Sequence, residues 1–318
     1  MKRIVGILAA AALAAPAVIA QPVKVDASIP SYQKTSGVSG NINSVGSDTM
    51  NNMMTLWAEA FTKMYPNIKV QVEGKGSSTA PAALIAGTAQ FGPMSRAMRA
   101  TEIDQFESKY GYKPTQIRTS YDALAVYVNK DNPLDKLTLA QVDAAFSKSR
   151  RRGGKNAATW GDLGLTGDWA GRPISLYGRN SASGTYGFFK EHTLKNGDYK
   201  DTVKEQPGSA SVVQGVTEDR FGMGYSGIGY RTSGVKVVSL AETGAASDGN
   251  YGDVVSGKYP LSRFLFIYIN KAPGKPLDPL VKEFVKFITS KEGQEVVIKD
   301  GYLPLSAEIA KQERAKVE

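Results

Sequence analysis

Short apolar runs, amphipathic stretches and glycine-rich turns alternate along the first third of the chain. Residues 40–47 read as a strand, and the stretch that follows predicts a helix ending at Pro66. The apolar residues of this helix recur at helical spacing: Met50, Met53, Met54, Trp57, Phe61 and Met64. Residues 68–74 alternate as a strand, residues 76–89 form a loop that opens a helix, and residues 89–95 read as a short strand and turn. This order predicts an α/β fold with a mostly parallel sheet.

Two longer apolar runs, near residues 122–129 and 263–270, predict the strongest strands of the chain. Between them the alternation of strands and helices is repeated. A chain of 318 residues is too long for one small core, and inserting one lobe into another requires two crossings. We therefore predict lobe one from residues 40–121 plus 264–318 and lobe two from residues 122–263. Each lobe is expected to hold a mixed, mostly parallel sheet flanked by helices, and the two apolar strands to join the lobes.

The first twenty residues have the features of a secretory signal peptide. Lys2 and Arg3 form a basic start, and the apolar run that follows is short and ends in small residues. Residues 21–39, with Pro, Ser, Gly and Gln, predict a flexible leader. No later stretch is long and apolar enough to span a bilayer, and no cysteine can carry a lipid anchor. We expect a soluble, exported protein in the periplasm of a Gram-negative cell.

The chain has no cysteine and a single histidine, His192, which limits the kinds of catalytic and metal site that it can form. These counts exclude a disulfide scaffold, a thiol nucleophile and a zinc–thiolate site, and they make a transition-metal site improbable. We expect no metal and no cofactor. His192 itself falls inside a predicted helix, where a surface position is the simplest interpretation.

The formal charge is +9, and removing Lys2 and Arg3 with the signal peptide lowers it by two, to +7. A basic exported protein can bind nucleic acid, membranes or small anions. The sharpest basic run, "KSRRRGGK" at residues 148–155, has no interleaved aromatic residue before Trp160. Because nucleic-acid sites usually combine charge with aromatic residues, we interpret this run as a solvated loop and expect no nucleic-acid partner.

Three loops share one design: "GSDT" at 46–49, "GSS" at 76–78 and "GRNSASGT" at 178–185. Each follows a predicted strand, carries glycine and hydroxyl residues, and opens a helix. In open α/β sheets, ligands bind beyond the carboxyl ends of the strands, and helix N-termini with free N–H groups suit anions. Each loop alone also reads as a helix N-cap, but Arg179 has no capping role. Its planar guanidinium can grip two oxygens of an oxyanion, so the three loops predict a site for a small tetrahedral anion.

Catalytic patterns are weaker. No G-x-S-x-G motif occurs, and His192 lies too far into the helix after Ser183 to form a nucleophile–base pair. The stretch "GDVVSGKY" at 252–259 imitates a phosphate-binding loop but ends in Tyr259, where a nucleotide site needs Ser or Thr. It also precedes a predicted strand instead of a helix. We interpret it as a turn.

These loops, together with "GSASVV" at 208–213 and "GYSGIGY" at 224–230, resemble the periplasmic phosphate-binding proteins of bacterial phosphate ABC transporters, which are type II periplasmic binding proteins. The resemblance runs from "GSDT" to "KDGYLPL" near the C-terminus. It implies two α/β lobes that are joined by crossing strands and close on dehydrated phosphate. It also implies a membrane permease as the partner and a monomeric receptor without catalytic activity.

The resemblance implies that Arg179 forks onto phosphate oxygens and that the other ligands are Ser47, Asp48, Thr49, Ser77, Ser95, Ser183, Gly184 and Thr185. Two departures stand out. Ser95 occupies the place where better-known relatives have an Asp that accepts the phosphate proton. Ser181 occupies the place where they have an Asp that holds the guanidinium. We infer that Asp48 acts as the proton acceptor here.

The leading hypothesis is therefore a transport receptor for inorganic phosphate. The alternative is a secreted phosphatase or other phosphoryl-handling enzyme, which needs a nucleophile with a base, or metals. A role in adhesion or signalling is neither supported nor excluded by the residues.

Overall fold

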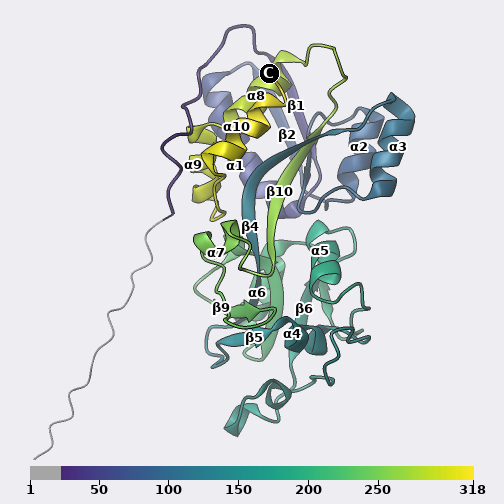
Figure 1. Ribbon diagram of the computed structural model, residues 1–318, viewed down its shortest axis with the longest axis vertical. Helices are drawn as coiled ribbons and strands as arrows, with labels where there is room; N and C mark the ends of the chain where they lie inside the picture. Colours follow the sequence, from purple (N-terminus) through teal and green to yellow (C-terminus); the bar gives the residue numbers. More distant parts are fainter. Residues whose placement is uncertain (1–22) are drawn as a thin grey trace, which may run out of the picture.

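The computed structural model describes residues 23–318, so the predicted signal peptide lies outside the described residues. It is a mixed α/β fold in which two long neighbouring strands, β4 (Thr115–Asn129) and β10 (Ser262–Ile269), run from one lobe to the other (Figure 1). The predicted α/β class and the two strong apolar strands are therefore confirmed. The lobe boundaries at residues 121/122 and 263/264 stay a prediction, and we keep the names lobe one and lobe two for these ranges.

Lobe one contains a parallel pair of strands, β1 (Gly40–Val45) and β2 (Ile68–Glu73), and the short strand β3 (Gly92–Met94). Helices cover these strands, and a 3-10 turn, η1 (Asp48–Met50), leads into the first of them. The helices are α1 (Asn51–Met64), α2 (Thr79–Ala86), α3 (Ala100–Tyr110), α8 (Pro279–Ile288), α9 (Lys291–Lys299) and α10 (Ala307–Ala315). Met50, Met53, Met54, Trp57 and Phe61 are buried in one core cluster. The predicted amphipathic helix is thus confirmed, with its apolar stripe packed against the C-terminal helices.

Lobe two is built around parallel strands that follow the predicted alternation. Its strands are β5 (Lys136–Thr138), β6 (Ser175–Arg179), β7 (Lys204–Gln206), β8 (Gly222–Gly227) and β9 (Val235–Ala241). Its helices are α4 (Leu139–Phe146), α5 (Gly184–His192), α6 (Ser209–Glu218) and α7 (Tyr251–Val255), with 3-10 turns η2 (Trp160–Leu163), η3 (Gly167–Trp169) and η4 (Ile228–Tyr230). Strand β6 pairs in parallel with β7 and β8, whereas the long strand β4 pairs antiparallel with β8, β9 and β10.

The crossing strands make the two lobes share one sheet. Its strand order is β3-β10-β4-β8-β6-β7, so a continuous ladder of hydrogen bonds passes through both lobes. In this ladder Asp122 of β4 lies directly opposite Arg263 of β10. An acidic and a basic residue are thus paired between the two crossing strands, at the level where the lobes meet.

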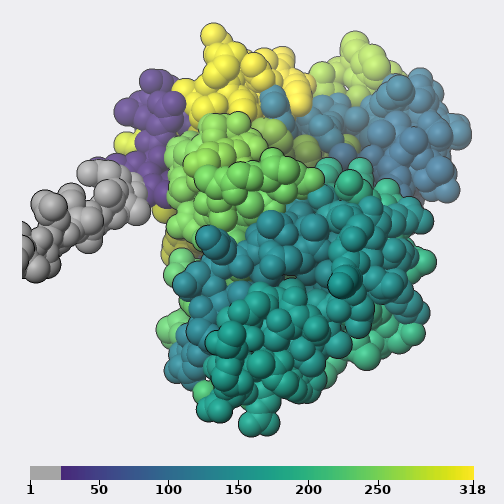
Figure 2. Space-filling model, turned by 60° about the horizontal axis from the view of Figure 1, so that its bottom comes forward, coloured from purple at the N-terminus to yellow at the C-terminus, as the bar shows by residue number. Residues whose placement is uncertain are grey.

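The N-terminal segment differs from the predicted flexible leader. The side chain of Ile29 is buried in a core cluster, and the backbone N–H of Ala307 donates to the Asp26 carboxylate. The Tyr32 hydroxyl donates to Glu283, and the N–H of Lys291 donates to the Pro30 carbonyl. Figure 2 shows this purple segment against the yellow C-terminal helices. Apolar packing and hydrogen bonds therefore both anchor this segment to the folded body.

Within residues 23–318, no helix is both long enough and apolar enough to cross a membrane.

Candidate functional site

The three predicted loops meet between the lobes. The 3-10 turn η1 and the loop before α2 come from lobe one, and the loop before α5 comes from lobe two. They touch directly, because the backbone N–H and the hydroxyl of Ser78 both donate to the Ala182 carbonyl, at 3.1 and 3.0 Å. Ser95, which follows β3, joins the same group. The structure therefore brings together residues that lie more than a hundred positions apart in the sequence.

Four of the predicted residues form a buried cluster of hydroxyl groups, which we call the hydroxyl cluster: Thr49, Ser77, Ser95 and Thr185. Each is fully buried. The Thr49 and Thr185 hydroxyl oxygens are 3.0 Å apart across the lobes, and those of Ser77 and Ser95 are 3.3 Å apart. The Ser95 and Thr185 hydroxyl oxygens are 3.4 Å apart. Because a hydroxyl both donates and accepts, these groups can exchange their mutual hydrogen bonds for bonds to an oxyanion.

Gly184 is needed for this close approach. A Cβ atom at this position would lie 2.3 Å from the Ser77 hydroxyl oxygen and 2.6 Å from that of Ser95. Ser183, the residue before it, caps α5, since its hydroxyl accepts from the N–H groups of Thr185 and Tyr186 at 3.1 and 3.3 Å. The N-terminus of α5 therefore points into the hydroxyl cluster without a side chain in between.

Arg179 lies beside η1, with its side chain 1% exposed. Its guanidinium donates to the Ser209 hydroxyl at 2.6 Å and to the Pro207 carbonyl at 3.1 Å, and it lies 3.3 Å from the Asp48 carboxylate. Burial lowers the pKa of Arg179 from its ordinary value, and the Asp48 charge acts in the opposite direction. An arginine remains charged under such a shift, so it brings a positive charge to the interior of the site.

Asp48 holds the guanidinium and, through its Oδ2 atom, accepts the backbone N–H of Ser209 at 2.7 Å. Its side chain is one-quarter exposed. In this geometry Asp48 orients Arg179, the role that Ser181 cannot fill. The proton-accepting role of Asp48 stays a prediction.

Two buried polar atoms of the predicted residues have no hydrogen-bond partner within the described part of the chain, the Ser47 hydroxyl oxygen and Arg179 Nε. Leaving a buried donor or acceptor unpaired costs about 1–3 kcal/mol. Both atoms belong to residues that sequence reasoning assigned to one ligand. Unpaired donors at this place are expected in a protein that binds an oxyanion there.

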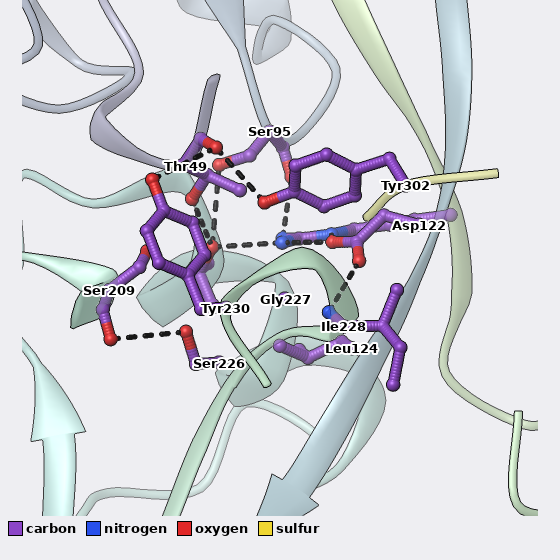
Figure 3. Close-up of polar contacts among 12 residues, drawn as sticks. Thr49, Ser95, Asp122, Leu124, Ser209, Ser226, Gly227, Ile228, Tyr230 and Tyr302 are labelled. Carbon is purple, nitrogen blue, oxygen red and sulfur yellow. Dashed lines mark hydrogen bonds and ion pairs between the residues drawn. The ribbon is translucent and has the colours of Figure 1, made fainter. Parts of the chain in front are cut away.

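Sequence reasoning missed the ion pair of Arg263 and Asp122. Arg263 donates through Nε to the Asp122 Oδ2 atom at 2.8 Å, and to the Ser95 carbonyl and the Thr185 hydroxyl at 2.8 and 3.0 Å. The backbone N–H of Ile228 donates to the other Asp122 oxygen at 3.1 Å (Figure 3). This pair therefore links the crossing strands to the hydroxyl cluster. Arg263 is the single charged residue of β10, and Asp122 begins the apolar run of β4; these two charges were the signal that could have identified the pair.

Two tyrosines and a serine were also missed. The Tyr302 hydroxyl donates to the Thr49 carbonyl at 3.0 Å (Figure 3). The Tyr230 hydroxyl donates to the Asp48 carbonyl, also at 3.0 Å. Ser209, inside the quoted "GSASVV", bonds both Asp48 and Arg179. These contacts hold η1 from lobe two and from the C-terminal region, so the first loop is positioned by parts of the chain far from it in sequence.

The basic run is not simply a solvated loop. The side chain of Arg152 is 9% exposed, and its guanidinium donates to the carbonyls of Thr193 and His192, at 2.6 and 2.5 Å. These carbonyls lie at the C-terminal end of α5, where a cation is favourable. Lys155 is exposed, as predicted, and so is His192. Arg152 thus anchors the helix whose other end points into the hydroxyl cluster.

All nine predicted site residues therefore belong to one region of buried hydroxyls, one buried guanidinium and helix N-termini. Within residues 23–318, no group of three or more His, Cys, Asp or Glu side chains could hold a metal ion. The arrangement suits a small oxyanion, since its polar groups are mainly hydrogen-bond donors and its fixed charges are close to balanced.

Comparisons with known proteins identify the family of this chain. The family described as the PBP superfamily domain matches residues 31–292. The chain is 57% identical to the phosphate-binding protein PstS of Pseudomonas aeruginosa over 289 residues, which are 90% of each chain. It is 28% identical to protein SphX of Synechococcus elongatus, over 93% of this chain and 87% of that one.

Solved structures agree with the fold. A putative phosphate ABC transporter substrate-binding protein with bound phosphate, from Clostridium perfringens, superposes with a TM-score of 0.71 at 23% identity. The match covers 84% of this chain and all of the other. A possible phosphate-binding protein from Planctomyces limnophilus gives 0.64 at 26% identity, over 88% and 99% of the two chains. On this sequence and structural evidence, the chain belongs to the PBP superfamily.

Proposed function

We propose that this protein is a receptor that binds inorganic phosphate between its two lobes and delivers it to the membrane permease of an ABC importer. We further propose that it works in the periplasm as a monomer and catalyses no reaction. The relatives named as phosphate-binding proteins support this function. The observation that carries it is the convergence of the nine predicted residues, including the unpaired Ser47 hydroxyl and Arg179 Nε.

The proposed binding step exchanges hydrogen bonds. The hydroxyls of Thr49 and Thr185 release each other, and each then bonds a phosphate oxygen, as does Ser77. The N–H groups at the start of α5 exchange their bonds to the Ser183 hydroxyl for bonds to phosphate. Arg179 contributes the positive charge, oriented by Asp48 and Ser209. Since the ligand contacts both lobes, it favours the arrangement in which they meet.

The Asp48 carboxylate should make the site bind phosphate more tightly than sulfate. Phosphate near neutral pH carries at least one proton and can donate to a carboxylate, whereas sulfate carries none. A fixed negative charge beside the site therefore meets a donor in phosphate and only lone pairs in sulfate. Discrimination by a fully buried group that one ligand leaves unpaired can reach about 10⁴–10⁵. Because Asp48 is one-quarter exposed, we expect a smaller ratio here.

Thermal unfolding of ligand-stripped protein tests this function. A ligand bound only by the folded state, at about 100 times its Kd, stabilises that state by about 2.7 kcal/mol. Phosphate should therefore raise the Tm by several degrees, and sulfate at the same concentration should leave it unchanged. Equal Tm shifts from both anions would indicate a general oxyanion-binding protein. The absence of a Tm shift with phosphate would contradict the proposed function.

A further inference from the structure

A second cavity, of about 520 Å³, lies between the lobes beside α5. Segment 96–99 of lobe one lines one side, α5 of lobe two lines the other, and β10 lines the end between them. None of the nine predicted phosphate-site residues lines it. Arg263 connects it to the hydroxyl cluster, because this residue lines the cavity and also bonds Thr185 and Ser95. We call this space the side cavity.

The side cavity is lined by four cationic side chains. They are Arg96, Arg99, Lys190 and Arg263, and Glu191 is the single acidic residue of the lining. Arg263 is neutralised by Asp122, and Lys190 pairs with Asp198 at 3.1 Å. Arg99 is exposed and forms no ion pair with any residue from 23 to 318. Arg96 pairs with Glu102 at 2.7 Å, so among these four cations only Arg99 is left without an ion-pair partner in the described part of the chain.

Arg96 supplies an unused donor in a buried position. The residue is 7% exposed, and its two terminal nitrogens each donate to Glu102 at 2.7 Å. Its Nε atom is buried and has no partner within the described residues. The atom faces α5 at Gly187, where an added Cβ would lie 3.8 Å from Nε and 3.7 Å from an Arg99 terminal nitrogen. A buried, unpaired guanidinium donor next to a second, unpaired arginine indicates a place for an anionic group.

The lining also contains several aromatic side chains. The rings of Phe188 and His192 lie 4.1 Å apart, and the Arg263 guanidinium lies over Phe188 at 5.3 Å. Phe264 and Phe266 of β10 also line the cavity and are half-buried. Inorganic phosphate would use only a small part of this space and none of the aromatic surface. Cavities of about 300–1,000 Å³ with apolar walls and a few convergent polar groups typically bind organic molecules.

We propose that the side cavity binds an organic phosphate monoester with an aromatic body. Its phosphate group would bond Arg96 Nε and Arg99, and its aromatic body would lie against the phenylalanine side chains. Because segment 96–99 and α5 belong to different lobes, such a ligand favours the arrangement in which the lobes meet. Binding in the side cavity and binding at the hydroxyl cluster should then strengthen each other by the same factor.

Adenosine 5′-monophosphate is a suitable probe, measured by calorimetry on protein saturated with inorganic phosphate. We expect it to bind, and we expect adenosine and ribose 5-phosphate to bind at least tenfold more weakly. Arg99→Gln should weaken binding of the monophosphate about tenfold, because it removes a charged donor to the phosphate group. The exposed Arg151→Gln is the matched control and should leave its Kd unchanged.

Three results would overturn the proposal. They are no binding of the monophosphate at millimolar concentration, a Kd that Arg99→Gln leaves unchanged, or binding that saturating inorganic phosphate abolishes. The last result would place the probe at the hydroxyl cluster. The titration can also be made without inorganic phosphate, so a failure of the proposed phosphate receptor function would be distinguished from a failure of the side cavity.

Discussion

Asp122→Ala is expected to destabilise the folded protein by about 3–5 kcal/mol. The side chains of Asp122 and Arg263 are 0% and 2% exposed, and their charged groups are 2.7 Å apart. Removing the carboxylate leaves the guanidinium buried without its counter-charge and leaves the N–H of Ile228 without its acceptor. Urea unfolding at neutral pH, without phosphate, measures the loss directly.

A surface ion pair provides the control. Lys236 and Asp135 are 2.9 Å apart, but their side chains are 32% and 85% exposed. Asp135→Ala should cost no more than about 1 kcal/mol, because solvent screens exposed pairs. The double variant Asp122→Ala with Arg263→Met should recover part of the lost stability, since it removes the uncompensated charge. Equal costs for Asp122→Ala and Asp135→Ala would show that the buried pair contributes no more than a surface one.

Arg179→Lys should weaken phosphate binding by about 2–5 kcal/mol, the range for breaking a buried charge-assisted contact. The substitution keeps the positive charge. It loses the planar fork, which bonds Ser209 and Pro207 with two different nitrogens while Nε remains free for a ligand. A single ammonium group cannot replace that geometry. Calorimetric titration with phosphate should show a Kd higher by a factor of roughly 30 or more.

Arg150→Lys, in the basic loop, is the matched control for this variant and should bind phosphate as the wild type does. Unfolding of Arg179→Lys without ligand is measured in parallel, so that loss of affinity is separated from loss of structure. An Arg179→Lys variant that folds and binds within threefold of the wild type would mean that Arg179 does not contact the ligand.

Local pattern was enough to predict the elements that position the site. The stripe from Met50 to Met64 predicted α1, and the two apolar runs predicted β4 and β10. The loops could be predicted because each joins the end of a strand to the start of a helix. At such a position, glycine and hydroxyl residues serve either as helix caps or as ligands of an anion. Arg179 stood out for the same reason, as a large charged residue in a loop of small ones.

Pairing across the fold could not be predicted in the same way. The contact of Asp122 with Arg263 depends on the register of two strands 141 positions apart. The contact of Asp48 with Arg179 depends on how the lobes meet, so the sequence favoured a different role for Asp48. The polar composition of residues 21–39 predicted a flexible segment. Composition alone does not show that the Ile29 side chain packs into a core cluster.

Arg152 illustrates the same limit. Three consecutive arginines read as solvated charge, yet one of them lies against the carbonyl end of α5. The conformation of the loop decides which of the three arginine side chains points inward, and a run of like charges in the sequence does not show this.

The most direct test of the account is a crystal structure of the protein grown with phosphate. We predict tetrahedral density between the lobes, within hydrogen-bond distance of the Arg179 guanidinium, the Thr49, Ser77 and Thr185 hydroxyls, and the N-terminus of α5. In that structure the direct bond between the Thr49 and Thr185 hydroxyls should be replaced by bonds to phosphate oxygens. Density for phosphate elsewhere, with this bond intact, would contradict the account.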